Sequence, residues 1–395
     1  MRLILISAVS IALASLPTFA YAVGGCGCSH VSPKSMVGQD ISDLMADPDR
    51  RALSNYGNIR LSLSNQFGDF NRFYADGQRM TDPRARSAFI SASLLGIDFA
   101  FFDRLTVSLQ LPFVVKQQKL GNPPPSPAGM FPKNTEGGDW TEAQIESFRN
   151  NVRPQLAERE AQGIGDIAIN FSSNVLPNSL RAAGFAFIVS TGLRIPTGNI
   201  EEDGGSVMML PQPFQLGSGH PELLLGASLQ KAFENYSLFL LTQGRVPLTR
   251  NKLDYVFGKE LSITTGGMYA LPFLDKRIRI GGQLDFSQIE KDNVQIITNF
   301  NINDPKGGNR IVPYPLVESN GDILNTGGTF LYIGPTLEIA PVPGFLLSAN
   351  FSILVIRNAN GNATRTNPMG KPAPLGQALA EGLFQISAAY TFGKS

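Results

Sequence analysis

Apolar and polar side chains alternate along most of the chain after residue 55. In 105–113, for example, Leu105, Val107 and Leu109 are separated by threonine and serine. A period of two places successive side chains on opposite faces of a strand, so the pattern predicts strands with one apolar and one polar face. We count twelve such segments, of which the clearest are 58–67, 105–113, 185–196, 259–271, 277–287 and 383–392.

The connections between these segments alternate in length. In a soluble antiparallel sheet the apolar face is the core, whereas in a membrane barrel it faces lipid. Barrels of the outer membrane have tight periplasmic turns and longer loops that face outward. The long gaps are 68–85, 115–162, 199–218, 250–258, 292–325 and 357–377, and the short ones are Asp103–Arg104, 177–184, 233–236, 272–276 and 340–344.

We therefore predict an all-β chain that forms a transmembrane antiparallel β-barrel of about twelve strands. Most segments exceed the ~5–6 residues typical of globular strands and reach the ~9–11 that a tilted membrane strand needs. An even strand count returns both ends of the barrel to the periplasm. Aromatic side chains near the short turns would form one interfacial girdle: Phe101, Phe102, Phe185, Phe233, Tyr236, Tyr269, Phe273, Phe345, Tyr390 and Phe392.

The first 22 residues have the features of a secretory signal peptide. Arg2 precedes the apolar run Leu3–Leu16, and Ala20-Tyr21-Ala22 forms an A-x-A cleavage site. Beyond it, no apolar run approaches the ~20 residues of a membrane helix. We expect residues 1–22 to be the signal peptide, 23–55 an N-terminal periplasmic arm or plug, and 56–395 the outer-membrane barrel.

Two helices are expected outside the strands. Residues 37–47 carry one apolar face, which suits either a hatch inside the barrel mouth or an arm against its rim. Within 115–162, Asp139 followed by Glu142 is similar to a capping box, and Pro154 ends or kinks the helix. This second helix is either a lid over the pore or a solvated surface element. Its apolar stripe consists of Ile145, Phe148 and Val152.

The net charge and the placement of charged residues limit the classes of partner that the protein could bind. The formal net charge is +1 and 16% of the residues are charged, which gives no case for nucleic acid. Charges on the predicted inner faces are nearly balanced, which argues against a strongly ion-selective pore. The alternative is that they form salt bridges across a narrow lumen. The predicted lumen-lining residues are Arg60, Arg194, Glu222, Arg245, Glu260, Arg277, Arg279, Asp285 and Glu338.

One cluster of soft ligands precedes the barrel. Cys26, Cys28 and His30 could hold Cu(I) or Zn(II), because thiolates and imidazole suit those metals. Alternatively, Cys26 is lipidated, or the cysteine pair is oxidised or idle near a mobile terminus. We predict no cofactor.

An enzyme would need a nucleophile and a base. Ser218 and His220 lie close to Glu222 along the chain, but no third partner completes a triad. The sequence has no phosphate-binding loop, dinucleotide fingerprint or zincin motif. We predict that the protein is not an enzyme.

Four runs of residues resemble a known family. Gly96–Phe113 is similar to the early hairpin of the outer-membrane proteins grouped as the meta-pathway phenol-degradation transporter family. The run 163–167 (GIGDI) resembles the family's G-x-G-D strand start, and 191–198 (TGLRIPTG) its strand end. The run 217–220 (GSGH) resembles the polar beginning of its next strand. A more distant likeness is to the long-chain fatty-acid transporters.

The resemblance implies a channel in the outer membrane of a Gram-negative bacterium. Its expected task is the passive uptake of small hydrophobic or aromatic molecules. The expected partners are outer-membrane lipid, small solutes and the barrel-assembly machinery, whose signal would be Tyr390 and Phe392 on the last strand. The chain is expected to be a monomer or a small homo-oligomer. The alternative is a closed structural barrel, or one that serves a surface complex, with no transport role.

Overall fold

The structure is a computed structural model. It describes residues 58–75, 78–80, 86–101, 105–121, 141–202, 210, 212–272, 276–294, 322, 326–359 and 377–392. The predicted signal peptide, the segment 23–55 and the cluster Cys26, Cys28 and His30 lie outside the described residues, as do 393–395.

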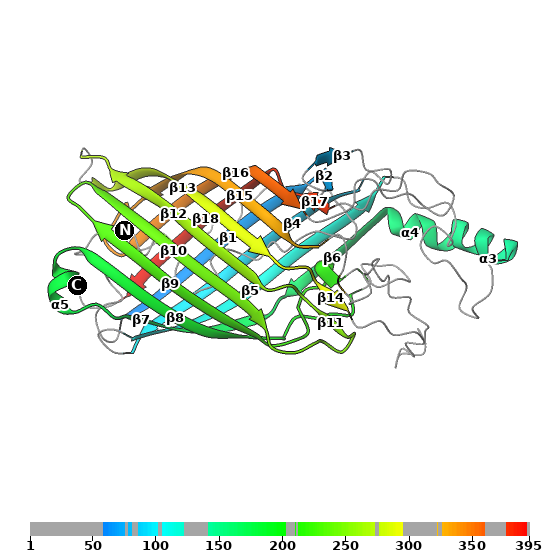
Figure 1. Cartoon of the computed structure of the whole chain (residues 1–395), viewed down its shortest axis with the longest axis horizontal. Coiled ribbons are helices and arrows are strands. Elements are labelled where there is room, and N and C mark those ends of the chain that lie inside the picture. The colour runs from blue at the N-terminus through cyan, green and yellow to red at the C-terminus, as the bar shows by residue number, and fades with distance from the viewer. Residues whose placement is uncertain are drawn as a thin grey trace, which may run out of the picture.

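The chain forms a closed antiparallel β-barrel of twelve strands, as the alternation predicts (Figure 1). The barrel closes because β1 pairs with β4 on one side and with β18 on the other. One of the twelve is formed by β6 and β7 in succession, both paired with β5. The strands are β1 (Ile59–Phe70), β4 (Arg86–Ala100), β5 (Leu105–Leu120), β6 (Glu158–Ile164), β7 (Ile167–Asn174), β8 (Phe185–Ile195), β9 (Glu222–Ala232), β10 (Tyr236–Pro247), β12 (Glu260–Ala270), β13 (Ile278–Ile289), β15 (Gly328–Ile339), β16 (Phe345–Ala359) and β18 (Gly382–Phe392).

The two ends of the barrel differ as expected, and we call them the short-turn end and the long-loop end. Strand β1 begins and β18 finishes at the short-turn end, where Ile59 pairs with Phe392. That end also carries α5 (Asn178–Ala182). The long-loop end carries β2 (Arg72–Ala75), β3 (Gln78–Met80), β17 (Gln377–Leu379), β11 (Tyr255–Val256), β14 (Asn293–Val294) and the 3-10 helix η5 (Gln212–Phe214). Among the described residues, no helix is long and apolar enough to span a membrane.

Burial follows the predicted alternation. Along β10, Leu238 and Leu240 are exposed, while Ser237, Gln243 and Arg245 are buried. Because the barrel is closed, the buried face of each strand is its inner face. An apolar exterior around a polar interior is the arrangement that a bilayer requires of a barrel.

The long connection predicted at 115–162 is shorter in the structure. Strand β5 continues to Leu120, and β6 begins at Glu158, with Lys119 paired to Glu158. This paired part of β5 and β6 lies at the long-loop end, where polar residues such as Gln117 and Lys119 can occupy either face of the strand. Without an apolar face, the period of two is lost and the strand escapes detection.

The helix in this connection differs from the prediction at its start. Helix α3 (Glu142–Ser147) is capped by Thr141, whose Oγ1 accepts from the Gln144 amide at 3.3 Å, while Gln144 Oε1 accepts from the Thr141 amide at 3.0 Å. Thr141, rather than Asp139, is therefore the N-cap residue, and the predicted cap is wrong. A threonine at the N-cap with glutamine three residues later makes a capping box as well as the predicted pair would.

The helix does not stop at Pro154. A π-helical turn, η4 (Phe148–Val152), precedes α4 (Arg153–Ala157), so the proline sits inside α4 and the irregular turn lies just before it. Proline has no amide hydrogen to donate to the preceding helical turn, and the irregular turn lies where that hydrogen bond is missing. Both helices project beyond the long-loop end, away from the barrel, and α3 buries no residue (Figure 1). Helix α3 is thus a surface element, and the alternative of a lid over the mouth is wrong for it, whereas Phe148 of the predicted apolar stripe is buried in η4.

An arginine on the outer face of a strand tests the membrane orientation. Leu240 is 42% exposed near the middle of β10, so Leu240→Arg should lower the stability of the folded barrel by about 2–4 kcal/mol. Leu180 in α5 is similarly exposed (43%) but lies at the short-turn end, where Leu180→Arg should cost about 0–1 kcal/mol. Urea unfolding in lipid vesicles, read out by heat-modifiable gel migration, measures both. Equal losses would contradict a lipid-facing β10.

Candidate functional site

The connection between β8 and β9 folds into the barrel at the long-loop end. We call the described residues of this connection, 196–202, 210 and 212–221, the inner loop. The sequence predicts an outward loop at 199–218, yet Leu210, Phe214 and Gln215 are all 0–1% exposed. This is the largest departure of the structure from the sequence prediction, and it places the loop where a molecule would enter the lumen.

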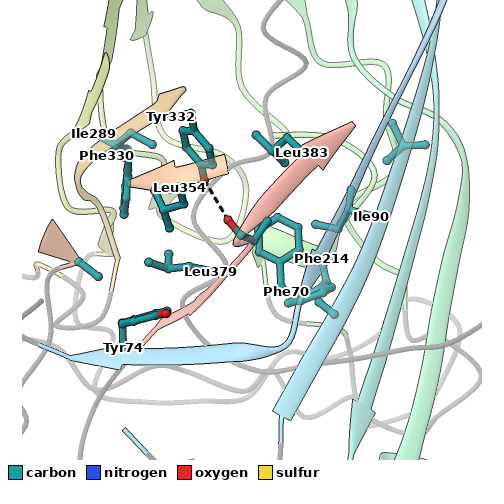
Figure 2. Close-up of a cluster of buried hydrophobic side chains, with 14 of the residues drawn as sticks. Phe70, Tyr74, Ile90, Phe214, Ile289, Phe330, Tyr332, Leu354, Leu379 and Leu383 are labelled. Carbon is teal, nitrogen blue, oxygen red and sulfur yellow. Dashed lines mark hydrogen bonds between the residues drawn. The ribbon is translucent and has the colours of Figure 1, made fainter. Parts of the chain in front are cut away.

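The tip of the inner loop packs in an apolar cluster inside the barrel. Phe214 lies beside Phe70 of β1 and faces Ile90 of β4, with Leu383 of β18 close by (Figure 2). The other barrel strands in the cluster are β5, β6, β13, β15 and β16. We call it the mouth cluster: Phe70, Tyr74, Ala88, Ile90, Val114, Ala161, Leu210, Phe214, Leu216, Ile289, Phe330, Tyr332, Leu354, Ala359, Leu379, Ala380 and Leu383.

The two ends of the inner loop meet at a narrow neck. A Cβ placed on Gly217 would lie 2.6 Å from the Gly198 carbonyl oxygen and 2.8 Å from its Cα, so these glycines allow a close approach of the two backbones. The Asp166 carboxylate joins both sides of the neck. It accepts from the Gly198 amide at 2.9 Å, and from the amide and hydroxyl of Ser218 at 2.7 Å each. Asp166 therefore joins the two ends of the inner loop to each other and to the barrel wall.

Asp166 owes its position to a break in the barrel wall. Strand β5 pairs with β7 up to Gln110 and with β6 from Phe113 onward. Three residues, 165–167, thus oppose Leu111 and Pro112, which makes a β-bulge. Pro112 has no amide hydrogen, and its carbonyl accepts from the Gly165 amide at 2.9 Å. Bulges redirect side chains, and this one directs Asp166 toward the loop.

Thr197 completes the join between the neck and the bulge. Its hydroxyl donates to the Gly165 carbonyl at 2.8 Å and accepts from the Ile167 amide at 3.0 Å. The three runs 163–167, 191–198 and 217–220 therefore meet at one place. From the sequence each was a separate strand boundary, and nothing in their spacing indicated that they contact one another.

The tip is held by side chains from two sides. Lys116 of β5 donates from Nζ to the carbonyl oxygens of Pro213 and Gln215, at 3.0 and 2.6 Å. Asn251 donates from Nδ2 to the side chain of Gln212 at 2.8 Å and to the Ser218 carbonyl at 3.0 Å. Besides its apolar contacts, the described part of the loop is thus held to the barrel by separate side-chain bonds, among them an ion pair between Glu201 and Lys252, rather than by the continuous ladder of a strand.

Four of the predicted lumen residues form a charge ladder beside the loop. One residue comes from each of the neighbouring strands β8, β9, β10 and β12. In this order they are Arg194, Glu222, Arg245 and Glu260, and positive and negative charges therefore alternate around the barrel. Glu222, which has no exposed side-chain surface, pairs with Arg194 and with Arg245, the latter at 2.9 Å. Arg245 also lies 3.2 Å from Glu260. Each charge is compensated locally, as a buried charge requires.

The other predicted lumen residues lie apart from this ladder. Arg279 and Glu338 face each other at 3.5 Å on β13 and β15. Asp285 accepts from Thr264 and Gln283, at 2.6 and 2.9 Å. Like Arg279 and Glu338, two further predicted residues lie toward the short-turn end: Arg60 of β1, 3.8 Å from Asp98, and Arg277, which precedes β13, is exposed and donates to the Pro341 carbonyl.

Ser218 and His220 have no arrangement for nucleophilic catalysis. The Ser218 hydroxyl donates to Asp166, and the His220 ring packs on Phe257 at 5.7 Å between ring centroids, 4.0 Å from Glu222 Oε1. Among the described residues, no group of three or more His, Cys, Asp or Glu side chains could hold a metal ion.

Acidification should loosen the inner loop. Burial lowers the pKa of His220, although the Glu222 and Asp166 carboxylates and the Pro221 carbonyl oppose this shift and Arg245 adds to it. Below the ordinary pKa of about 6.5, a withdrawn loop would bind a proton that the packed loop excludes, so the packed state loses stability as the pH falls. Amide exchange in 212–220, corrected for intrinsic rates, should rise by at most about tenfold per pH unit.

The control is His220→Phe, which keeps a ring against Phe257 and cannot titrate. Its exchange rate, corrected in the same way for intrinsic rates, should be independent of pH between about 7.5 and 5. The same acid response in both proteins would show that another group senses the proton.

Comparisons with known proteins support the fold. No family model matches the sequence, and no curated protein matches it. Among solved structures, the chain is similar to an outer membrane channel from Pseudomonas putida F1, with 11% identity and a TM-score of 0.55 over 90% of this chain and 100% of that one. A FadL homologue from Pseudomonas aeruginosa has 10% identity and a TM-score of 0.40, over 94% and 99% of the two chains. At 11% identity, the likeness to the Pseudomonas putida channel is one of fold alone.

Proposed function

We propose that the protein is an outer-membrane channel for the passive uptake of small hydrophobic or aromatic molecules, with the inner loop as its gate. The mouth cluster carries this proposal. Its apolar side chains are gathered inside the long-loop end of a barrel whose inner face is otherwise rich in polar residues. An apolar solute that arrives from outside would find a matching surface there.

A gate must be able to move while the wall stays intact. Barrel strands are held by continuous ladders of hydrogen bonds, whereas the described part of the inner loop is held by its apolar tip and by separate side-chain contacts such as those of Asp166, Lys116 and Asn251. Its withdrawal would leave the twelve-stranded ladder unchanged. The outer membrane location rests on the apolar exterior and on the alternation of short turns and long loops.

Replacement of 199–216 by a short glycine-serine linker tests the channel. Single-channel conductance in planar bilayers should increase, because a glycine-serine linker has no apolar side chains to pack against the mouth cluster and would not block the barrel mouth. The matched control replaces 142–147, helix α3, which buries no residue and projects away from the barrel, and should leave the conductance unchanged. A liposome uptake panel of phenols, alkanes, fatty acids and sugars would then identify the favoured class of solute.

The second candidate is a closed structural barrel or one that serves a surface complex. The observation in its favour is that many inward side chains, including Glu222, Asp285 and Glu338, are almost completely buried. If the linker variant is folded and electrically silent, this second function is the better one.

The aromatic end of the last strand is the proposed assembly signal. Tyr390 and Phe392 lie on β18, with ring centroids 4.6 Å apart, and Phe392 is 49% exposed. We expect the barrel-assembly machinery to bind this edge before β18 pairs with β1.

A further inference from the structure

The tip of the inner loop presents an unusual combination of groups to the barrel wall. The Phe214 ring is 0% exposed within the mouth cluster (Figure 2). The carbonyl groups on either side of it, those of Pro213 and Gln215, both accept hydrogen bonds from Lys116 Nζ. Three consecutive residues, 213–215, thus supply an apolar ring and two carbonyl oxygens, and both oxygens bind the ammonium group of Lys116.

We propose that the Phe214 pocket, with Lys116 at its edge, is a binding site for small carboxylic acids that have a ring-sized apolar body. The tip of the loop occupies this site in the closed state and imitates such a ligand. This inference rests on the proposed channel function and names the class of cargo that the mouth selects.

A carboxylate reproduces both oxygen contacts and adds a charge. The bonds from the Lys116 ammonium to the two carbonyls are already charge-assisted, and a carboxylate would add the attraction of a full opposite charge, which is stronger away from bulk water. When the tip withdraws, Lys116 loses two carbonyl acceptors, and a neutral hydrocarbon would not replace them. A sugar would leave its hydroxyl groups facing apolar walls such as Phe70, Ile90 and Leu383. The pocket therefore favours an anion with an apolar body.

The resident tip competes with the ligand. Apparent affinity is reduced by the fraction of molecules in which the site is open, so the wild-type protein should bind weakly. Removal of the ring should remove most of this competition, because an apolar cavity the size of a benzene ring stays dry and accepts an aromatic molecule.

Fluorine NMR of para-fluorobenzoate, with the full protein in nanodiscs, tests the site. Phe214→Ala should bind this probe at least about tenfold more tightly than the wild-type protein does. Phe171→Ala is the matched control, because Phe171 is a phenylalanine 47% exposed on the outer face of β7, and it should bind as the wild-type protein does. Asp166→Asn leaves every wall of the pocket intact and should also bind the probe more tightly. If both variants are folded and neither binds the probe more tightly than the wild-type protein does, the proposal is overturned.

Two comparisons test the role of Lys116. The uncharged para-fluorobenzamide should bind Phe214→Ala more weakly than the benzoate does, by about tenfold. This preference should disappear when Lys116→Met is added to Phe214→Ala. Equal binding of the two probes, or a preference that survives the loss of Lys116, would overturn the carboxylate assignment.

The outcome is separable from that of the channel. If the linker variant conducts and Phe214→Ala does not bind the probe, the site is wrong and the channel stands. If Phe214→Ala binds the probe and the linker variant never conducts, the site stands and the channel is wrong.

Discussion

Replacement of Glu222 by glutamine is expected to destabilise the folded barrel by about 3–5 kcal/mol, the range for breaking a buried ion pair from one side. The Glu222 side chain is fully buried between Arg194 and Arg245. Without its charge, these guanidinium groups repel each other and are left with Glu260 as the remaining carboxylate of the ladder. Urea unfolding in lipid vesicles, followed by heat-modifiable gel migration, measures the loss.

The control is an exposed pair at the same end of the barrel. Lys259 and Glu290 are 3.2 Å apart, with more than half of each side chain exposed, so Glu290→Gln should cost no more than about 1 kcal/mol. Addition of Arg194→Met to Glu222→Gln should restore part of the stability, because one uncompensated charge is removed. A loss for Glu222→Gln no larger than that for Glu290→Gln would mean that water reaches the ladder.

The strands themselves were predictable because lipid imposes a strict rule on one face. In β5 and β10, every second residue must suit hydrocarbon, which leaves a period of two in the sequence. Where the same strands rise past the bilayer, as Lys116–Leu120 does in β5, neither face is under this constraint. The boundaries of the long connections were therefore misplaced while the number of strands was right.

The ladder was predictable only in part. Alternation alone places Arg194, Glu222, Arg245 and Glu260 on inner faces. Their contact depends on the register between strands, which the hairpin turns set and which no local pattern reveals. The sequence thus supplied the four residues as separate candidates, and the structure made them one network.

The inner loop did leave a signal that local pattern analysis passes over. Leu210, Phe214 and Leu216 are large apolar residues within a connection taken to be exposed. Such side chains need cover, and the nearest cover is the barrel mouth. The role of Asp166 had no comparable signal, because it follows from a bulge opposite Pro112 and from contacts with residues 32 and 52 positions away.

An alanine at Gly217, in the neck of the inner loop, is expected to favour the withdrawn state of the loop. Gly217→Ala places a methyl group where a Cβ would lie 2.4 Å from Asp166 Oδ1 and 2.6 Å from the Gly198 carbonyl oxygen. Overpacking of this kind costs about 1–3 kcal/mol. Because the strain is relieved when the loop withdraws, the withdrawn population should rise by about 5- to 150-fold. Planar-bilayer recordings should therefore show more frequent open events than the wild-type protein does.

Gly244→Ala is the matched control for this experiment. Gly244 lies in β10, and a Cβ there would meet its nearest neighbours, the Glu260 carbonyl oxygen and Leu225 Cβ, at 3.9 and 4.0 Å. This is ordinary contact, so the substitution should leave the recordings unchanged, and both variants should keep the heat-modifiable migration of a folded barrel. If Gly217→Ala is folded and opens no more often than Gly244→Ala, the neck does not control access to the lumen. A gate would then have to lie elsewhere, and the linker replacement of 199–216 would be expected to have no effect on conductance either.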